Sequence, residues 1–190
     1  MNPHIAGIVA CLVSSIGYAT MDATTKLLIE SLPAGWVLAL RCALMVVVVA
    51  AAFALTGRSA LFRTTAWRLT ALRSFVFGMT SALVVLAFTR LTLADTVAIY
   101  FLSPIFTVML GTVILGEHMT RRAIVAAVVG FAGVALIAKP TGANFSWFYV
   151  VPIAAAFTGA MQDVLARKLR GHSPPGTLLL YGQVATLILS

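Results

Sequence analysis

The sequence predicts an all-α fold, a polytopic bundle of membrane-spanning helices. The chain of 190 residues is 61% hydrophobic and only 9% charged, and its mean hydropathy is +1.04. Soluble domains are roughly 45–50% apolar and about 25% charged. The apolar residues also gather in runs of about 20, the length that a helix needs to cross a bilayer. Composition and run length together indicate an integral membrane protein.

Seven apolar segments are predicted as membrane spans with a window of about 19 residues. The N-terminal segment is expected to be a retained helix. It lacks the Lys/Arg n-region of a signal peptide and exceeds the usual apolar length of about 7 to 15 residues. The short connections carry most of the charged residues. The predicted spans are 5–28, 34–55, 72–89, 94–115, 122–138, 147–168 and 175–190.

The distribution of Lys and Arg predicts the orientation. With a cytoplasmic N-terminus, nine cations fall in inner connections and three in outer ones, and Arg41 lies inside the second span. Cytoplasmic loops are enriched in Lys and Arg. We therefore expect a multi-pass protein of the inner or plasma membrane with its N-terminus in the cytoplasm. The inner cations are Arg58, Arg63, Arg68, Arg73, Arg121, Arg122, Arg167, Lys168 and Arg170, and the outer ones are Lys26, Arg90 and Lys139.

An internal repeat emerges when the sequence is shifted against itself by 141 residues. ATMDATTKLLIESLPAGWVL then aligns with AMQDVLARKLRGHSPPGTLL. The first unit contains five predicted spans, an odd number, so the second unit enters the membrane from the opposite side. Inverted repeats are typical of secondary transporters, whose substrates bind near the midplane between the halves. The identical pairs are Ala19 and Ala160, Asp22 and Asp163, Leu28 and Leu169, Pro33 and Pro174, Gly35 and Gly176, and Leu38 and Leu179.

The repeat also predicts the domain organisation. Residues 1–140 form a first unit of five transmembrane helices, and residues 146–190 begin a second unit with its first helix and part of the next. The last predicted span is still apolar where it stops, at LILS. Because a second unit of five spans needs about three more helices, we expect a ten-helix protein of which about seven spans are present.

A proline lies near the middle of the fourth span, in AIYFLSPIFTVMLGTVILGE. Pro104 has no N–H to donate to a carbonyl near Tyr100, so we expect a kink there. Neighbouring helices, cavity water or a hydroxyl such as that of Ser103 can satisfy the freed carbonyl. Two interpretations stay open, a hinge or cavity-lining bend and a kink that only packs.

Three polar side chains are expected in one layer of the bilayer. At 1.5 Å per residue, Asp22, Arg41 and Tyr100 each lie about 9 to 10 Å from the outer end of their spans. An ionisable group inside a span costs about 2.5 to 3.5 kcal/mol and therefore faces a partner or a cavity. One interpretation is assembly, with Asp22 paired to Lys26 or Arg41. The other is an outer gate or an anchor for a charged substrate. Tyr18, on the polar first span, either lines that pathway or packs between helices.

Further candidates lie near predicted cytoplasmic ends. Gln162 and Asp163 form the inverted counterpart of the layer around Asp22, where a helix-end salt bridge with Arg167 is the alternative to a gate. Glu117 closes the fourth span just before a pair of arginines. It is either a proton or gating site or an interfacial ion pair that holds the loop.

The stretch LADTVAIYFLSPIFTVMLGTVILGEHMTRRAIVAAVVGFAGVALIAKP, residues 93–140, resembles the fourth and fifth helices of an EamA domain, the ten-helix drug/metabolite transporter type. Arg41 is similar to an arginine often placed in the second helix of that family. The resemblance is strong over residues 1–140 and weaker over residues 146–190. It implies a polytopic carrier of small organic solutes with both termini cytoplasmic. The residues that carry it are Ala94, Ala98, Pro104, the Gly116–Glu117 pair, Gly130 and Gly133.

Other classes of function lack the residues they need. GTVILGE has the two glycines of a phosphate-binding loop but a glutamate in place of the lysine, so direct use of ATP is not expected. The three histidines are dispersed, and Asp22 has no histidine beside it. We therefore predict no catalytic residue, no metal site and no cofactor. No polar binding face for a nucleic acid accompanies the net charge of +8.

The sequence therefore predicts a secondary transporter of a small organic metabolite or drug that works by alternating access between inverted repeats. Its expected partners are the lipid bilayer, a small-molecule substrate and a coupling proton or exchanged solute. The alternative is a non-transporting or truncated membrane scaffold protein, and a membrane-embedded enzyme is the least favoured class.

Overall fold

A computed structural model describes residues 3–56, 64–116, 121, 124–125, 128–130, 132 and 147–189. All regular structure in these residues is helical, which confirms the predicted all-α fold. Helices overlap six of the seven predicted spans, and the predicted span 122–138 lies mostly outside the described residues. The helices are α1 (Pro3–Ile29), α2 (Ala34–Thr56), α3 (Trp67–Phe88), α4 (Leu93–Tyr100), α5 (Ser103–Leu115), the short 3₁₀ helix η2 (Trp147–Tyr149), α7 (Val150–Lys168) and α8 (Pro175–Leu189).

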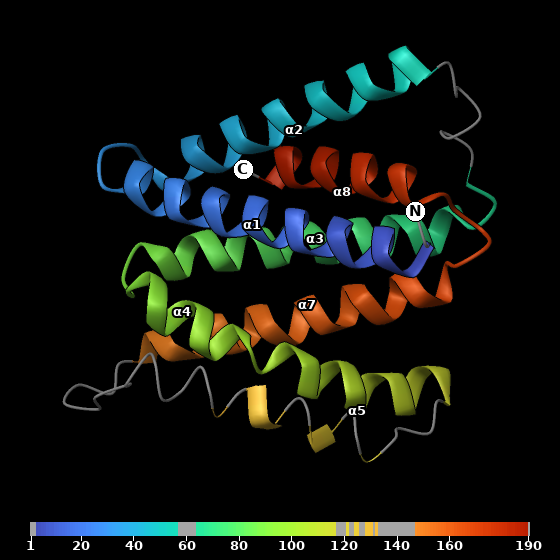
Figure 1. Cartoon of the computed structure of the whole chain (residues 1–190). Helices are drawn as coiled ribbons and strands as arrows, with labels where there is room; N and C mark the ends of the chain where they lie inside the picture. The colour runs from blue at the N-terminus through green and yellow to red at the C-terminus, as the bar shows by residue number, and fades with distance from the viewer. Residues whose placement is uncertain are drawn as a thin grey trace.

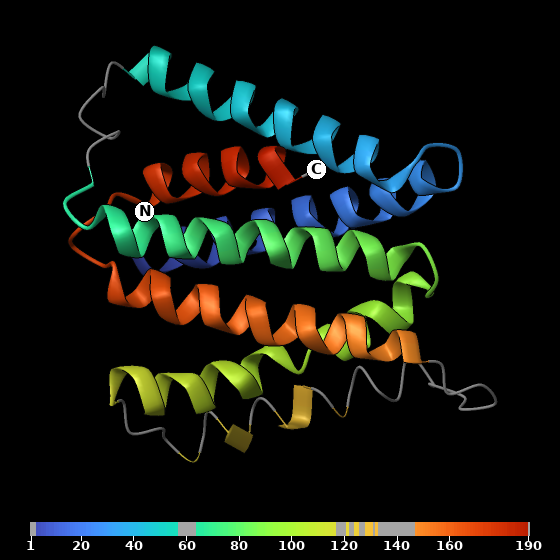
Figure 2. The ribbon, with the colours of Figure 1, turned by 180° about the vertical axis from the view of Figure 1, so that it is seen from behind.

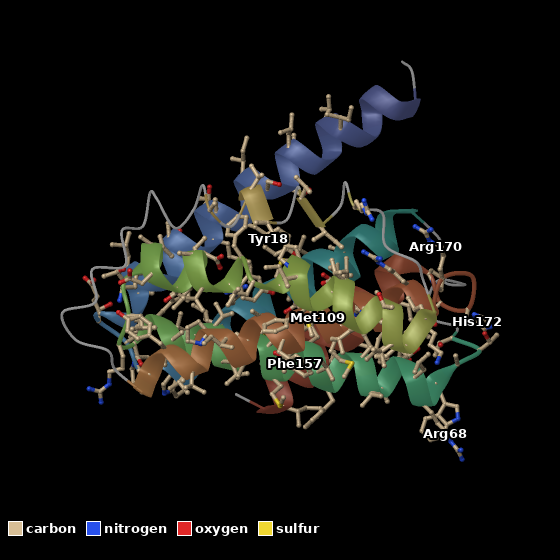
Figure 3. All side chains as sticks on the ribbon, turned by 90° about the horizontal axis from the view of Figure 1, so that it is seen from below. Tyr18, Arg68, Met109, Phe157, Arg170 and His172 are labelled. Atoms are coloured by element: carbon tan, nitrogen blue, oxygen red, sulfur yellow. The ribbon has the colours of Figure 1, made fainter. Side chains whose placement is uncertain are left out.

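Helix α3 lies at the centre of the bundle. It packs against α7 and α8, while α5 packs against α7 and α2 packs against α8. Figures 1 and 2 show these helices side by side, with α3 between α8 and α7. Helix α1 crosses α3 in the view of Figure 1, and Figure 3 shows its N-terminal part leaving the rest of the bundle. The middle and C-terminal parts of α1 therefore carry its contacts with the other helices.

Among the described residues, three stretches are long and apolar enough to cross a membrane. They are Ala34–Ala51, Trp67–Phe88 and Leu93–Leu115, the last of which combines α4 and α5. Gly176–Ile188 is apolar but shorter. The outward face of α2 carries large apolar side chains, as lipid tails allow. The chain is therefore a polytopic helical membrane protein. The exposed apolar residues of α2 include Trp36, Leu40, Leu44 and Val47.

Small residues form the buried face of α7. Ala155, Ala156 and Ala160 are fully buried there, and Gly159 lies among them. Side chains of this size let helix backbones approach closely in a membrane. Next to this face, Phe106 of α5 meets Phe157 of α7 edge to face, with ring centroids 5.6 Å apart. The close approach of α7 to α3 and α5 follows from this composition.

Helix α3 begins at Trp67 and not near residue 72, as the sequence predicts. Arg68 and Arg73, assigned above to a connection, therefore lie within the helix. Arg68 is exposed and stacks over the Trp67 ring at 5.4 Å, whereas Arg73 is buried at 9% exposure. The prediction for Arg73 was wrong because a hydropathy window penalises a charge even when a neighbouring helix supplies its partner.

The predicted fourth span consists of two helices. Helix α4 ends at Tyr100, the chain turns at Phe101 and Leu102, and α5 begins at Ser103. Pro104 lies in the first turn of α5, where a missing N–H removes no helical hydrogen bond. The expected kink is therefore a full break, because the proline starts a new helix one turn after the old one ends.

The ends of this two-helix span carry typical capping residues. Thr92 caps α4, since its hydroxyl oxygen accepts a hydrogen bond from the Asp95 amide at 3.1 Å. The Thr92 hydroxyl in turn donates to the Asp95 carboxylate at 2.7 Å. Helix α5 ends at Leu115 and is capped by Gly116, whose φ of 66° is a left-handed conformation that favours glycine. Local sequence therefore sets both ends of the span.

Candidate functional site

A cavity of about 370 Å³ lies inside the bundle, with walls from α1, α2, α3, α4 and α7. Pockets for small molecules usually measure about 300 to 1,000 Å³. The wall combines carboxylate, guanidinium, hydroxyl and aromatic groups, a polar set for the interior of a membrane bundle. We call this cavity the central pocket. Six of the candidates from the sequence line it, namely Tyr18, Asp22, Arg41, Tyr100, Gln162 and Asp163.

Asp22 of α1 and Arg41 of α2 form an ion pair at the wall of the central pocket. Asp22 Oδ1 and Arg41 Nη1 are 3.6 Å apart, and the two side chains are 29% and 20% exposed. This distance is too long for a hydrogen bond, and Arg41 Nη1 has no hydrogen-bond partner. The two helices are joined by a short turn, and the two residues lie at the same level of their helices, as the sequence predicts.

Lys26, the other partner considered for Asp22, turns to a different helix. Its amino group donates hydrogen bonds to the carbonyl oxygens of Phe88 at 2.6 Å and Leu91 at 3.1 Å. These carbonyls lie at the C-terminal end of α3, where a positive charge is favoured by the helix dipole. Lys26 therefore links the C-terminal end of α1 to that of α3, and the ion-pair partner of Asp22 is Arg41.

Tyr100 ends α4 with its ring against α7. A Cβ built on Gly159 would lie 2.5 Å from the Tyr100 hydroxyl oxygen, a distance that real Cβ atoms do not show. Only glycine at that position leaves room for the phenol in its present place. Gly159 is therefore a positioning residue for Tyr100 that the sequence alone does not single out, because the contact joins residues distant along the chain.

Helix α3 supplies a stripe of pocket residues that the sequence analysis missed. Their spacing of three and four residues places them on one face of the helix. Two adjacent hydroxyl residues, Thr80 and Ser81, inside an apolar span were the signal that could have found this face. Thr96 and Val97 of α4 also line the pocket and were not predicted. The α3 stripe comprises Phe77, Thr80, Ser81, Val84 and Phe88.

Asp163 and Gln162 of α7 line the central pocket together with Asp22 of α1. Asp163 interacts electrostatically with Arg73 of α3 and with Arg167, the partner considered from the sequence. The side-chain oxygen of Gln162 is buried without a hydrogen-bond partner among the described residues. Arg73 thus joins the set of charged groups around the pocket, although it lies just outside the lining.

Two other described candidates, Ser103 and Pro104, do not line the central pocket. Ser103 is buried at the start of α5, where its backbone carbonyl accepts a hydrogen bond from the Thr107 hydroxyl at 2.9 Å. Pro104 follows it in the first turn of α5. Both residues shape the break next to Tyr100 rather than the lining itself. Glu117 lies outside the described residues, and so do His118 and Arg122.

The pattern of a membrane-embedded polar pocket beside a broken helix agrees with a comparison with protein families. The EamA-like transporter family matches residues 5–139. The chain belongs to this family. The match includes five of the predicted spans and therefore the first unit of the predicted repeat. No solved structure matches the chain.

Several curated relatives of this EamA-family chain are transporters. It is 32% identical over 114 residues to the S-adenosylmethionine uptake transporter of Rickettsia prowazekii (strain Madrid E), a match to 60% of this chain and 38% of the relative. It is 29% identical over 85 residues to the riboflavin transporter of Vibrio cholerae serotype O1, or 45% of this chain and 28% of that relative. The chain thus covers well under half the length of these relatives.

A second cavity of about 240 Å³ lies between α1 and α2 of this EamA-family chain. Its wall is almost entirely apolar and includes Met21, Leu44 and Met45. Arg41 lines both this cavity and the central pocket. One guanidinium therefore separates the polar interior from an apolar groove.

Metal-ligating residues do not cluster in the part of the chain that the structure describes. No group of three or more His, Cys, Asp or Glu side chains is close enough there to hold a metal ion. Cys42 is a buried free thiol in the core cluster with Leu38 and Val85.

Proposed function

We propose that this chain forms part of a secondary transporter that moves a small organic metabolite across the inner or plasma membrane, with the central pocket as its binding site. The observation that carries the proposal is the group of three charged side chains, Asp22, Arg41 and Asp163, around a cavity inside a membrane bundle. Charges in spans are costly, and they usually mark substrate or ion pathways. Membership in the EamA-like transporter family supports the same function.

We propose alternating access between two inverted units as the mechanism. The units are residues 1–140 and a second unit that begins in residues 146–190. Asp22 and Asp163 correspond under the shift of 141 residues, and both line the central pocket. Transporters with inverted repeats place their substrates at the interface between the repeats. A pocket shared by equivalent residues of the two units supports this mechanism.

The central pocket favours a solute that has an aromatic ring and a positively charged or zwitterionic group. Its lining has two carboxylates and one guanidinium, together with the aromatic rings of Tyr18, Tyr100 and Phe77. Rings of this kind attract cations and stack on flat apolar groups. The compounds named for two relatives, S-adenosylmethionine and riboflavin, both contain a heteroaromatic ring system. We propose this class of metabolite as the substrate, with a proton or an exchanged solute as the coupling partner.

Uptake measurements test the proposed function directly. Cells that express the full-length gene should accumulate labelled members of a panel of ring-bearing metabolites above cells with an empty vector. Uptake should fall when Arg41 is replaced by Leu and should persist when Arg90, an exposed cation outside the pocket, is replaced by Leu. A protein that reaches the membrane and takes up nothing from the panel would favour the non-transporting scaffold instead.

Reporter fusions test the proposed orientation. With a cytoplasmic N-terminus, fusions after residues 62 and 119 should report a cytoplasmic location, and fusions after residues 92 and 142 an external one. The basis is the distribution of cations, with eight on the inner side once the buried Arg73 is set aside and three on the outer side. Arg68, Arg170 and His172 lie at the same end of the bundle in Figure 3, as this orientation requires. Reversal at two or more of the four sites would contradict it.

A further inference from the structure

The pocket-facing stripe of α3 continues beyond the central pocket as a row of polar residues. Phe77 is the most N-terminal α3 residue that lines the pocket. Ser74, Arg73 and Thr70 come three, four and seven residues before it, on the same face of the helix. All three are buried. A buried polar row in a central membrane helix is costly unless it has partners.

Helix α8 runs beside this row in the same direction as α3. The Thr70 and Ser173 hydroxyls are hydrogen-bonded at 3.3 Å, and Arg73 Nη1 donates to the Leu178 carbonyl at 2.9 Å. The two contacts join partners that are separated by 103 and by 105 positions in the chain. The two helices are therefore parallel and in register. Thr177 therefore lies level with Arg73. We call the two facing rows, Thr70, Arg73, Ser74, Ser173 and Thr177, the α3–α8 seam.

The α3–α8 seam contains several polar atoms without a protein partner. Arg73 Nε, Ser74 Oγ and Thr177 Oγ1 are all buried and make no hydrogen bond among the described residues. Buried polar groups in folded proteins are almost always satisfied, by protein or by ordered water. Three such atoms at one level of two adjacent helices leave hydrogen-bonding sites that ordered water can fill.

Phe77 separates the seam from the central pocket. Its ring lies against Gly182 of α8, where an added Cβ would be 3.1 Å from the ring. The Arg73 guanidinium lies 6.0 Å from the ring centroid, within range of a cation–π interaction. Because Arg73 is also bonded to α8, it holds the ring in place between the two helices.

The end of the seam away from the central pocket lies where the connections before α3 and α8 meet. The Thr64 hydroxyl is 2.6 Å from the Ser173 hydroxyl and 3.0 Å from that of Thr70. The Thr65 hydroxyl donates to the His172 carbonyl at 3.1 Å. These residues precede α3 and α8, so hydroxyl contacts tie together the starts of both helices. The polar row thus runs from this end of the bundle to Phe77.

We propose that the α3–α8 seam is a second access route to the central pocket, and that Phe77, positioned by Arg73, closes it in this structure. The inference rests on the proposed transport function, because alternating access requires one opening on each side of the membrane. Arg73 is then a positioning residue, which acts on the route through the aromatic ring. If the seam serves packing alone, the ring can be trimmed without opening any path.

Side-specific labelling of single cysteines tests this proposal. The background is the full chain with Cys11→Ser and Cys42→Ala, and the probe is a small, permanently charged methanethiosulfonate reagent. It is applied to right-side-out and inside-out membrane vesicles. Ser74→Cys should react from the side of the Thr64–Ser173 contact. Phe75→Cys, an exposed apolar position on the same helix, is the matched lipid-facing control and should not react.

Removing the ring should open the route to the pocket. In the background Phe77→Ala, labelling of Ser81→Cys from the side of the seam should rise about tenfold, which corresponds to about 1.4 kcal/mol less stabilisation of the closed form. Phe77→Leu, which keeps an apolar side chain, should change the rate far less. Arg73→Lys should give an intermediate increase, because it keeps the charge but loses the planar guanidinium.

Two results would overturn the proposal. One is Ser74→Cys that reacts no faster than Phe75→Cys, a measurement that leaves Phe77 intact and so does not depend on the folding of the Phe77→Ala variant. The other is an unchanged side preference of Ser81→Cys in well-folded Phe77→Ala protein. Uptake by the native protein together with either result would reject the second route and retain transport. A tenfold gain in labelling without any uptake would retain the route and reject transport.

Discussion

Removal of Asp22 alone is expected to destabilise the protein more than removal of Asp22 and Arg41 together. At their separation of 3.6 Å, two unit charges attract by about 5 kcal/mol with an effective dielectric constant near 20. Loss of hydration offsets most of this attraction, because each buried ion gives up several kcal/mol. The intact pair therefore contributes little net stability, about 1 kcal/mol. Without Asp22, the Arg41 guanidinium still lacks its hydration but no longer has the attraction of the carboxylate.

The expected values follow from this balance. Asp22→Ala should lower the free energy of unfolding by about 2 to 3 kcal/mol, somewhat below the 3 to 5 kcal/mol for a fully buried pair, because both side chains keep some exposure. The double variant Asp22→Ala with Arg41→Leu should lose only about 1 kcal/mol. It should also be inactive, because Arg41 lines the pocket in which the substrate is proposed to bind.

A double-mutant cycle measures this coupling. Membrane abundance and unfolding of the purified protein in detergent report stability, and uptake by vesicles reports activity. Arg90→Leu serves as a matched control, since this exposed cation lies outside the pocket. The double variant is compared with the two single variants. If its loss of stability equals their sum within about 0.5 kcal/mol, and its relative uptake equals the product of theirs, the two side chains do not interact. The ion pair would then have no role in assembly.

Three further substitutions test how the pocket is positioned. Gly159→Ala should displace the Tyr100 phenol and raise the KM of uptake about tenfold, because a methyl group does not fit beside the hydroxyl. The control Gly17→Ala meets no neighbouring atom and should leave KM unchanged. Lys26→Met should lower the melting temperature in detergent by removing two charge-assisted hydrogen bonds, worth about 1.5 to 3 kcal/mol each; an unchanged value would mean that α1 is held elsewhere. Pro104→Ala should leave membrane insertion intact and slow uptake, and unchanged kinetics would leave this residue a packing role only.

Sequence alone predicted the features that depend on the length of a helix or on the position of a residue along it. The length of the apolar runs predicted α2 closely because hydrocarbon thickness sets the length of a span. Depth along the helix predicted that Asp22 and Arg41 meet, because a short turn makes α1 and α2 antiparallel neighbours with a known rise per residue. The proline in the fourth span predicted a kink, whereas the structure has a full break between α4 and α5. Local rules thus located the first charged layer of the pocket.

The sequence was insufficient where contacts between distant helices decided the outcome. Hydropathy averages over a window, so it does not reveal which face of α3 turns inward or that Arg73 finds a partner on α8. The place of Asp163 depends on how α7 packs against α3, which no local pattern encodes. The same holds for Gly159, whose role becomes visible only beside Tyr100. These residues complete the pocket, and tertiary packing alone brings them together.

Charge around Asp163 links the central pocket to the α3–α8 seam. Arg73 attracts Asp163 across the pocket wall and also holds Phe77. A solute cation that binds Asp163 competes with Arg73 for the same carboxylate, and this weakens one of the interactions that keep the ring in place. A ligand shifts a conformational equilibrium only by the difference in its affinity for the two forms.

We therefore expect a transported cationic solute to raise the labelling rate of Ser81→Cys, behind the Phe77 ring, from the seam side, and Asp163→Asn to abolish that increase. The Asn side chain keeps the shape of Asp163 but lacks the charge for which the solute and Arg73 compete. The labelling rate of Ser81→Cys without solute should stay measurable in this variant, so that loss of the response is distinct from loss of the fold. Equal labelling with and without a solute that the native protein demonstrably transports would show that pocket charge does not control the seam. Closure by Phe77 would then depend on packing against Gly182 alone.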